Sequence, residues 1–295
     1  MPFRSGILAT RKDLPMFSDV LLTVDFDRTL TGPDSKIPQR NIEAIEYFMQ
    51  NGGAFTVNTG RSIATFGKYL DAIPHNAPFL LYNGSAAYDN GQLTQLIPID
   101  LDVWDTMAKV KALVPALNLE IQGTTYHHLI EPSEKLIALY DKLGWQYKIA
   151  QWGEDVGAFI KFAIFGNPET ASLAPLFEGT EEELALFAQT EEKLKQLLGD
   201  KVEVFRAAPR IIDVQPRGVS KLAAARRLQK TMERKWLVCV GDAENDIPML
   251  DGADYAYCPA DGVVAERYET VCPCGDGAVA DVIYKKIPEI LQIQP

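Results

Sequence analysis

The sequence has few histidines and cysteines. The 295-residue chain holds 3 histidines and 4 cysteines, and no histidine follows His128. Cys272-Pro-Cys274 has no second pair at a zinc-binding spacing, which argues against a zinc knuckle. The cysteines are therefore expected to be structural or free thiols in a reducing, cytoplasmic setting. All four lie in the last fifth of the chain: Cys239, Cys258, Cys272 and Cys274.

Long apolar runs and positive charge are also scarce. No apolar stretch approaches the length of a membrane-spanning helix. Charged residues and Pro15 interrupt residues 1–19, so this segment does not have the pattern of a signal peptide. The chain carries 29 Lys and Arg against 40 Asp and Glu, a net charge of −11. Such a surface repels nucleic acid and anionic membranes. A small anionic substrate remains compatible if cations are concentrated locally.

The segment at residues 21–32 combines a short apolar run with two acids. Leu21–Val24 is typical of a strand buried on both faces. Asp25 and Asp27 follow it two residues apart, so in extended backbone they point to the same side. Two adjacent carboxylates repel unless a cation or a shared proton intervenes. A polar loop that caps the next helix is the alternative.

Strands and helices alternate in the first and last parts of the chain, whereas the part between them has another pattern. Residues 38–51 predict an amphipathic helix, 54–57 a strand, 62–70 a helix and 79–82 a strand, which favours a parallel sheet covered by helices. From about 90 to 215 strand-like and helical runs segregate, as in an inserted α+β module. The first pattern returns at Pro216, with a strand at 236–240. The expected fold is an α/β, Rossmann-like parallel sheet with helices on both faces, plus an inserted α+β domain.

Both helices and strands are predicted within residues 90–215. Helices are expected at 103–113, 134–143 and 181–198, and strands at 93–97, 119–121, 159–165, 202–205 and 211–214.

Polar groups follow four of the predicted strands. In open α/β sheets ligands bind outside the carboxyl ends of the strands, so we expect these groups to converge on one crevice. They are Asp25 with Asp27, Thr59 with Gly60, Asn83 with Gly84, and Asp242.

The segment Gly241–Asp246 adds a second group of acids. Asp242 and Asp246 are four residues apart and share a face if a helix begins there, with Asn245 beside them. They can simply cap that helix. Together with Asp25 and Asp27, however, they form an oxygen-only donor set that suits Mg²⁺ completed by a substrate phosphate.

A phosphate also needs a cation and hydrogen-bond donors. Lys221 is predicted at the start of a helix, after a glycine turn and just before the strand that leads to Asp242. Thr59 and the backbone around Gly60 supply donors. A solvated lysine is the alternative.

Four motifs in order resemble those of the haloacid dehalogenase-like hydrolase superfamily, and within it the Cof-type phosphatases with a type IIB cap, a group that includes sugar phosphatases. The resemblance implies a catalytic core at 1–89 and 216–295 and a type IIB α+β cap at 90–215, because the interval between Thr59 and Lys221 is long enough for a domain. The motifs are DFDRT at 25–29, NTGR at 58–61, GVSK at 218–221 and GDAEND at 241–246.

The resemblance also implies roles for individual residues. Asp25 is the nucleophile that forms an aspartyl-phosphate, and Asp27 is the general acid and base. Mg²⁺ is held by the Asp25 carboxylate, the Asp27 backbone carbonyl and Asp242, with Asp246 orienting the metal shell. The residues implied to hold the phosphoryl group are Phe26, Thr59, Gly60, Lys221 and Asn245.

The chain departs from the Cof-type pattern at Arg28, where glycine is usual. If the loop keeps its shape, we expect φ below zero there, because arginine lacks the freedom of glycine. Arg28 either reaches a second anionic group or is a solvated side chain. Arg61 is either a surface residue or an organiser of its loop.

Aromatic and histidine residues of the central part are candidates for contact with a leaving group: Tyr126, His127, His128 and Trp152. Adjacent histidines in a strand usually point one inward and one outward as structural residues, so we do not assign them to the site.

Three functions compete. The first is a Mg²⁺-dependent phosphatase acting on a small phosphorylated metabolite, a sugar phosphate above all. The second is a phosphomutase or phosphotransferase, which a requirement for a bisphosphate activator would reveal. The third is a non-catalytic phosphosugar-binding protein, whose sequence mark would be loss of Asp25 or Asp27, and both are present. The sequence identifies neither the substrate nor the oligomeric state.

Overall fold

A parallel sheet lies at the centre of one of the two compact units of the chain. The computed structural model describes residues 15–166 and 178–292. Its first unit comprises the chain up to Asn58, Ile73–Phe79 and the chain from Ala225 onward; its second comprises Thr59–Ala72 and Leu80–Ala224.

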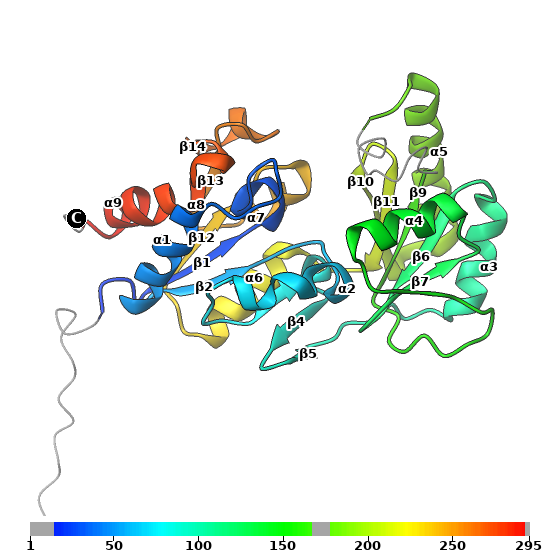
Figure 1. Cartoon of the computed structure of the whole chain (residues 1–295), viewed down its shortest axis with the longest axis horizontal. Coiled ribbons are helices and arrows are strands. Elements are labelled where there is room, and N and C mark those ends of the chain that lie inside the picture. The colour runs from blue at the N-terminus through cyan, green and yellow to red at the C-terminus, as the bar shows by residue number, and fades with distance from the viewer. Residues whose placement is uncertain (1–14, 167–177, 293–295) are drawn as a thin grey trace, which may run out of the picture. The chain divides into compact units, whose positions relative to one another are not determined.

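Strand β1 is in the interior of the five-stranded sheet of the first unit. Every neighbouring pair in this sheet is parallel (Figure 1). All residues of β1 and β2 are buried, as expected for a parallel sheet covered on both faces. The strand order is β14 (Glu269–Val271), β13 (Tyr255–Pro259), β12 (Trp236–Val240), β1 (Val20–Val24) and β2 (Ala54–Val57).

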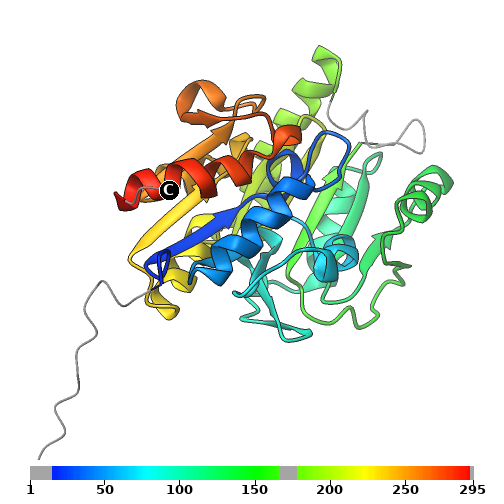
Figure 2. The same cartoon turned by 60° about the vertical axis from the view of Figure 1, so that its left-hand side comes forward.

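The connections of this sheet place helices on opposite faces. Helix α1 (Gln39–Gln50) joins β1 to β2, whereas α7 (Ile247–Asp251) joins β12 to β13 in the opposite direction along the sheet. Because such crossovers are right-handed, the two helices cover different faces. Helices α8 (Ala278–Asp281) and α9 (Ile287–Leu291) lie on the α1 side (Figure 2). The connections diverge between β1 and β12, where doubly wound sheets bind ligands.

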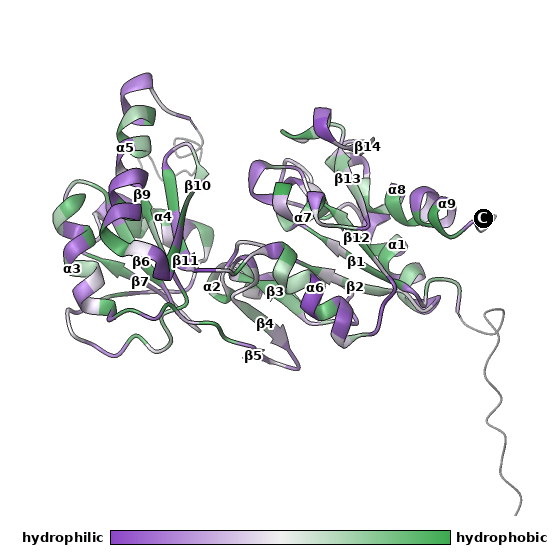
Figure 3. Ribbon diagram, turned by 180° about the vertical axis from the view of Figure 1, so that it is seen from behind, coloured by the Kyte–Doolittle hydropathy of each residue, from purple (hydrophilic) through white to green (hydrophobic). Residues whose placement is uncertain are grey.

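The second unit contains a six-stranded, mainly antiparallel sheet. The apolar side chains of one face pack with helices α3 (Val103–Leu113) and α5 (Glu181–Leu198), while α4 (Glu134–Leu143) packs with Ala163 and Phe165 of the other face. Figure 3 shows the strands mainly green and α5 with purple segments. The order is β10 (Val202–Ala208), β11 (Ile211–Pro216), β9 (Lys161–Phe165), β6 (Asn118–Gln122), β7 (His127–Ile130) and β8 (Tyr147–Ile149).

Shorter elements complete the described chain. They are α2 (Ile63–Phe66), α6 (Lys221–Thr231), and a three-stranded sheet of β3 (Phe79–Leu81), β4 (Ala86–Asp89) and β5 (Gln92–Thr94). Within the described ranges, no helix is long and apolar enough to cross a membrane.

The predicted fold class is confirmed: a parallel sheet with helices, and a second sheet region. Helices predicted at 103–113, 134–143 and 181–198 have those bounds. The strands at β4, β8 and β14 were not predicted, because each is short and only partly apolar. The division into a core and a cap at 90–215 stays a prediction.

Candidate active site

Asp25 follows directly on β1, at the carboxyl end of the parallel sheet. Its backbone N–H donates to the carbonyl of Val240 at 2.9 Å, so the ladder between β1 and β12 continues past the strand and fixes its position. Its side chain is mostly buried, at 7% exposed. The chain then coils through one wide turn, Phe26–Leu30, closed by the N–H of Leu30 on the carbonyl of Asp25 at 3.2 Å.

Phe26 and Asp27 of this turn differ in how far their side chains are buried. The Phe26 ring is fully buried, so only the backbone of this residue is available to a ligand. Asp27 is half-buried. Its carboxylate does not belong to the group of clustered acids described below, in agreement with a role separate from metal binding through its side chain.

The expectation for Arg28 is wrong. Its φ is 59° and its ψ 13°, the left-handed conformation that glycine adopts easily. Hydrogen bonds hold the turn in this conformation, including the N–H of Arg28 to Oγ1 of Thr31 at 3.2 Å. The side chain is exposed. Arginine in this conformation therefore carries backbone strain of about 1 kcal/mol.

The loop after β12 is held by Asp246. Its carboxylate accepts the N–H groups of Asp242 at 3.1 Å and Ala243 at 3.2 Å, and it is fully buried. Gly241 permits this approach, because a Cβ there would lie 2.6 Å from the Cβ of Asp246. Asp246 thus caps the short helical turn, as the alternative interpretation expected, and orients Asp242 at the same time. Asn245 is exposed on that turn.

Three buried acids form a carboxylate cluster in the first unit. One oxygen from each of Asp25, Asp242 and Asp246 lies within 4.8 Å of the others. The hydroxyl of Thr29 donates to Oδ1 of Asp242 at 3.1 Å. An oxygen-only donor set at this separation, without His or Cys, fits a hard divalent cation such as Mg²⁺.

The second unit contains the predicted Thr59–Gly60 loop. Thr59 is buried, donates its N–H to the carbonyl of Leu80 at 2.9 Å, and accepts the N–H of Asn83 at 3.0 Å. Gly60 is required, because a Cβ would lie 2.8 Å from Oδ1 of Asn83. The guanidinium of Arg61 donates to the carbonyl of Thr65 at 3.4 Å, as an organiser of the loop would.

A strained turn after β3 packs against the beginning of α6. Tyr82, Asn83 and Gly84 all have left-handed backbones, with φ of 52°, 55° and 96°. A Cβ on Gly84 would lie 2.7 Å from the carbonyl oxygen of Ser220. Only glycine therefore allows this turn to approach the backbone of the residue before Lys221 so closely. Lys221 itself is 3% exposed, so it is not the solvated lysine of the alternative interpretation.

The structure thus brings the predicted residues together in two sets, one in each unit. Asp25 and Asp242 meet in the first, and Thr59, Gly60 and Asn83 meet in the second beside the start of α6. Their convergence on a single crevice stays a prediction.

A buried polar cluster in the second unit was missed by sequence reasoning. Both Nδ1 of His127 and the hydroxyl of Tyr140 bond to Oε2 of Glu120, the first at 3.2 Å, and Lys161 forms an ion pair with Asp213. All five residues are less than a tenth exposed. The alternation of polar and apolar residues in NLEIQ at 118–122 was the available signal, because it puts Asn118, Glu120 and Gln122 on one face.

Burial and neighbouring groups shift the pKa values of the two acids in this cluster, Glu120 and Asp213. Burial by itself would raise the pKa of Glu120, but His127, Gln122 and Lys161 outweigh burial and lower it below its ordinary value. For Asp213, burial outweighs Lys161 and raises the pKa.

The adjacent histidines are both structural. Nε2 of His127 lies 2.5 Å from the hydroxyl oxygen of Ser62, and His128 pairs with Glu154 at 3.3 Å. They point to opposite faces of the sheet, as predicted, but both are buried. Ser62, His127 and Glu120 form a line resembling a hydrolytic triad. However, Ser62 is 1% exposed, which leaves no access for a substrate.

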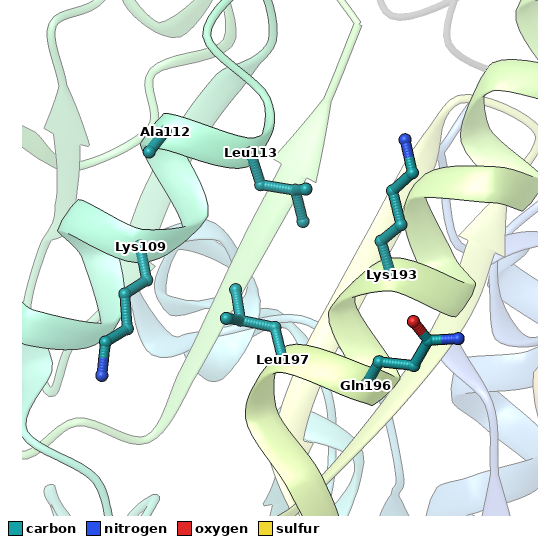
Figure 4. Close-up of a pocket in the computed structure, with 6 residues that line it drawn as sticks. All are labelled: Lys109, Ala112, Leu113, Lys193, Gln196 and Leu197. Carbon is teal, nitrogen blue, oxygen red and sulfur yellow. The ribbon is translucent and has the colours of Figure 1, made fainter.

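Two other features lie apart from the candidate residues. A groove between α3 and α5 is lined by Leu113 and Leu197, which point toward each other, and by the alkyl stems of two lysines (Figure 4). None of the predicted site residues line it. The four cysteines are free thiols, and Cys274 bonds to Asp261, with Sγ 3.2 Å from the carboxylate.

Comparisons with known proteins agree with these observations. The sequence model described as haloacid dehalogenase-like hydrolase matches residues 22–264. The chain is 25% identical over 248 residues, 79% of this chain and 85% of the relative, to the 5-amino-6-(5-phospho-D-ribitylamino)uracil phosphatase of Bacillus subtilis. It is 24% identical over 240 residues to the HMP-PP phosphatase of Yersinia enterocolitica, covering 78% of this chain and 80% of the relative.

Solved structures share the fold. A haloacid dehalogenase-like hydrolase from Bacteroides thetaiotaomicron has a TM-score of 0.74 at 17% identity, covering 90% of this chain and 98% of that one. A subclass IIB sugar phosphatase has a TM-score of 0.70 at 20% identity, covering 90% and 99%. The predicted resemblance and the expectation of an enzyme are confirmed. The family model spans well over half of the sequence, and the chain belongs to the haloacid dehalogenase-like hydrolases.

Proposed function

We propose that this chain is a Mg²⁺-dependent phosphatase that hydrolyses a small phosphorylated metabolite, a sugar phosphate above all. The carboxylate cluster carries the proposal. Asp25, Asp242 and Asp246 are buried with oxygens within 4.8 Å of one another, in a family of hydrolases. Three like charges at this distance favour a bound cation. Mg²⁺ held by Asp25, Asp242 and the Asp27 carbonyl would offset the charge of an approaching phosphate.

Asp25 and Asp27 have different roles in the proposed reaction, as nucleophile and as general acid and base. A carboxylate oxygen of Asp25 attacks phosphorus, and the bond from phosphorus to the leaving-group oxygen breaks as Asp27 gives that oxygen a proton. Asp27 then takes a proton from water, whose oxygen attacks phosphorus. The bond to Asp25 breaks and inorganic phosphate leaves. Half-burial of Asp27 beside a buried Asp25 suits these roles, because an acid and base must exchange protons with solvent.

The phosphoryl group itself needs fixed donors. We assign this role to the backbone of Phe26, to Thr59 and Gly60, and to Lys221 and Asn245. The burial of Thr59 and Lys221 supports the assignment, since a buried cation and hydroxyl are positioned before the substrate arrives. The names of the relatives support the substrate class, because they include a ribityl phosphate and a sugar phosphate.

The test is hydrolysis of p-nitrophenyl phosphate, which needs no specific leaving-group contact. Activity should require Mg²⁺, disappear with EDTA, and fall about 10³-fold or more in Asp25→Asn, because the nucleophile is lost. Asp251→Asn is the matched control and should retain wild-type activity. Asp251 is an exposed acid of the same unit that accepts a hydrogen bond from the Tyr268 hydroxyl.

A protein that is inert with Mg²⁺ on this substrate and on a panel of metabolite phosphates would refute the proposal and favour a phosphosugar-binding protein. A requirement for a bisphosphate activator would instead identify a phosphomutase.

A further inference from the structure

The loop at residues 59–62 is bonded to the six-stranded sheet of its own unit at two points. Nζ of Lys161 on β9 donates to the carbonyl of Gly60 at 3.3 Å. Nε2 of His127 on β7 lies 2.5 Å from the hydroxyl oxygen of Ser62. These partners are 101 and 65 residues apart in the sequence. Two basic side chains of the sheet therefore reach alternate residues of one short loop.

Both basic side chains are held by acids on the same face of the sheet. Lys161 forms an ion pair with Asp213, and Nδ1 of His127 bonds to Oε2 of Glu120 at 3.2 Å. The four residues share a face because of the register of β11, β9, β6 and β7, which are consecutive in the sheet. All four are less than a tenth exposed. The sheet therefore fixes the positions of the two groups that contact the loop.

The contact at Gly60 also orients the hydroxyl of Thr59. The carbonyl of Gly60 and the N–H of Arg61 belong to one planar peptide unit, so a bond that fixes the carbonyl fixes the N–H as well. This N–H donates to Oγ1 of Thr59 at 3.2 Å. Because the oxygen accepts this bond, the O–H of Thr59 is directed away from Arg61 and can donate to a ligand. Lys161 thus acts on Thr59 through the peptide plane between them.

The contact at Ser62 replaces a bond that a serine usually makes in this place. Ser62 is the N-cap of α2, where a serine hydroxyl commonly accepts a backbone N–H of the first turn. Here the hydroxyl caps no backbone N–H of α2, all of whose residues the structure describes. It lies against His127 instead, with the hydroxyl of Thr65 as a second partner at 3.3 Å. The end of the loop is therefore anchored to the sheet.

We propose that Lys161 and His127 are positioning residues of the phosphate site, which hold the Thr59–Gly60 loop in the conformation that binds the phosphoryl group. The inference rests on the proposed function, in which Thr59 and Gly60 bind that group. Neither basic side chain needs to contact the substrate, in agreement with their burial. Donors fixed before the ligand arrives bind it more tightly, because less conformational freedom is lost on binding. The affinity for phosphate therefore depends on strands β7 and β9.

A purely structural role for the same contacts predicts a different result. It predicts lower stability but unchanged phosphate binding by the protein that remains folded. A backbone bond from the N–H of Gln146 to the carbonyl of Ala64, at 3.3 Å, does not involve either basic side chain. Removal of a side-chain contact should therefore leave the loop beside the sheet and disturb only its donors.

The first experiment uses the double variant Lys161→Met/Asp213→Leu. It removes both members of the ion pair together, so no buried charge is left without a partner and most of the stability should be kept. The contact with Gly60 is lost all the same. With Mg²⁺, KM for p-nitrophenyl phosphate and Ki for inorganic phosphate should both rise about 10-fold. The change in kcat should be much smaller, because substrate and product lose the same interaction.

A second experiment compares His127→Leu with His127→Gln. Both variants lose the bond from Nδ1 to Glu120, but only glutamine places a polar atom near the former position of Nε2. His127→Leu should raise KM and Ki about 10-fold, and His127→Gln should restore most of this loss. The difference between the two variants therefore reports the contact with Ser62.

His128→Leu is the matched control. His128 is a buried histidine on the same strand, but it points to the opposite face and pairs with Glu154 at 3.3 Å. Its loss should leave KM and Ki unchanged.

Unchanged KM and Ki in both the double variant and His127→Leu, or an equal rise in His128→Leu, would overturn the inference while the wild-type protein still hydrolyses p-nitrophenyl phosphate. A wild-type protein that hydrolyses no phosphate ester with Mg²⁺ would instead refute the proposed function, and the inference with it.

Discussion

The carboxylate cluster of the first unit and the buried polar cluster of the second are made of similar residues but balance their charges differently. Asp25, Asp242 and Asp246 place three like charges within 4.8 Å. Thr29 and the backbone N–H groups of Asp242 and Ala243 donate hydrogen bonds to this cluster. In the second unit Lys161 pairs with Asp213 and His127 with Glu120, so each acid has a basic partner.

Buried charges are tolerated when they are paired or bind a metal. We propose a bound cation for the first cluster, whereas in the second the acids and bases pair with one another. Removal of one charge should therefore be measured as lost cation binding in the first cluster and as a lost ion pair in the second.

The largest effect is expected from Lys161→Met. The ammonium and the Asp213 carboxylate are both less than a tenth exposed, so the substitution leaves a buried charge uncompensated. We expect the free energy of unfolding to fall by about 3–5 kcal/mol, measured by urea denaturation. The double variant Lys161→Met/Asp213→Leu should recover most of this loss.

The pH dependence of Lys161→Met provides an internal check. Burial already raises the pKa of Asp213, and loss of Lys161 removes an opposing effect. An acid with a raised pKa in the folded state costs stability once the pH rises through that pKa. The deficit of the variant should therefore be small in acid and grow with pH. A deficit that stays constant with pH would show that lost packing, not charge, is responsible.

A smaller effect is expected from Asp25→Asn, which removes one of the carboxylates proposed to hold the cation. Added Mg²⁺ should stabilise the wild type by about 2.7 kcal/mol at 100 times its dissociation constant. In thermal melts Asp25→Asn should gain much less, because a proposed ligand of the ion is lost. An equal gain in both proteins would contradict the role given to Asp25 in cation binding.

Local signals account for what the sequence predicted. An apolar run gave the bounds of β12, and helical periodicity gave those of α4 and α5, because burial on one or both faces leaves its pattern in consecutive residues. The acids Asp25 and Asp242 were found because each lies within two residues of the end of such a strand. Their side chains meet since β1 and β12 are neighbours in the sheet.

Tertiary pairing accounts for what the sequence did not show. Glu120, His127 and Lys161 become neighbours only through the register of β6 with β7 and β9, which no local pattern specifies. The side-chain amides of Asn83 and Gln122 are oriented in turn by hydrogen bonds to Gln215 and Glu120. The φ of Arg28 was predicted incorrectly, because the prediction used the backbone preference of arginine. The hydrogen bonds of the turn decide the conformation instead.

The smallest effect concerns the turns that follow β1 and β3, where each unit has a left-handed residue. The second unit has Asn83 at φ 55°, a residue that tolerates this conformation, whereas the first has Arg28 at φ 59°. We expect Arg28→Gly to raise the free energy of unfolding by up to about 1 kcal/mol, net of the greater entropy of glycine in the unfolded chain. Arg28→Ala is the control, because it removes the same exposed side chain and keeps the strained Cβ. If both variants have equal stability in urea, the backbone of Arg28 stores no strain, and the left-handed conformation costs this turn nothing.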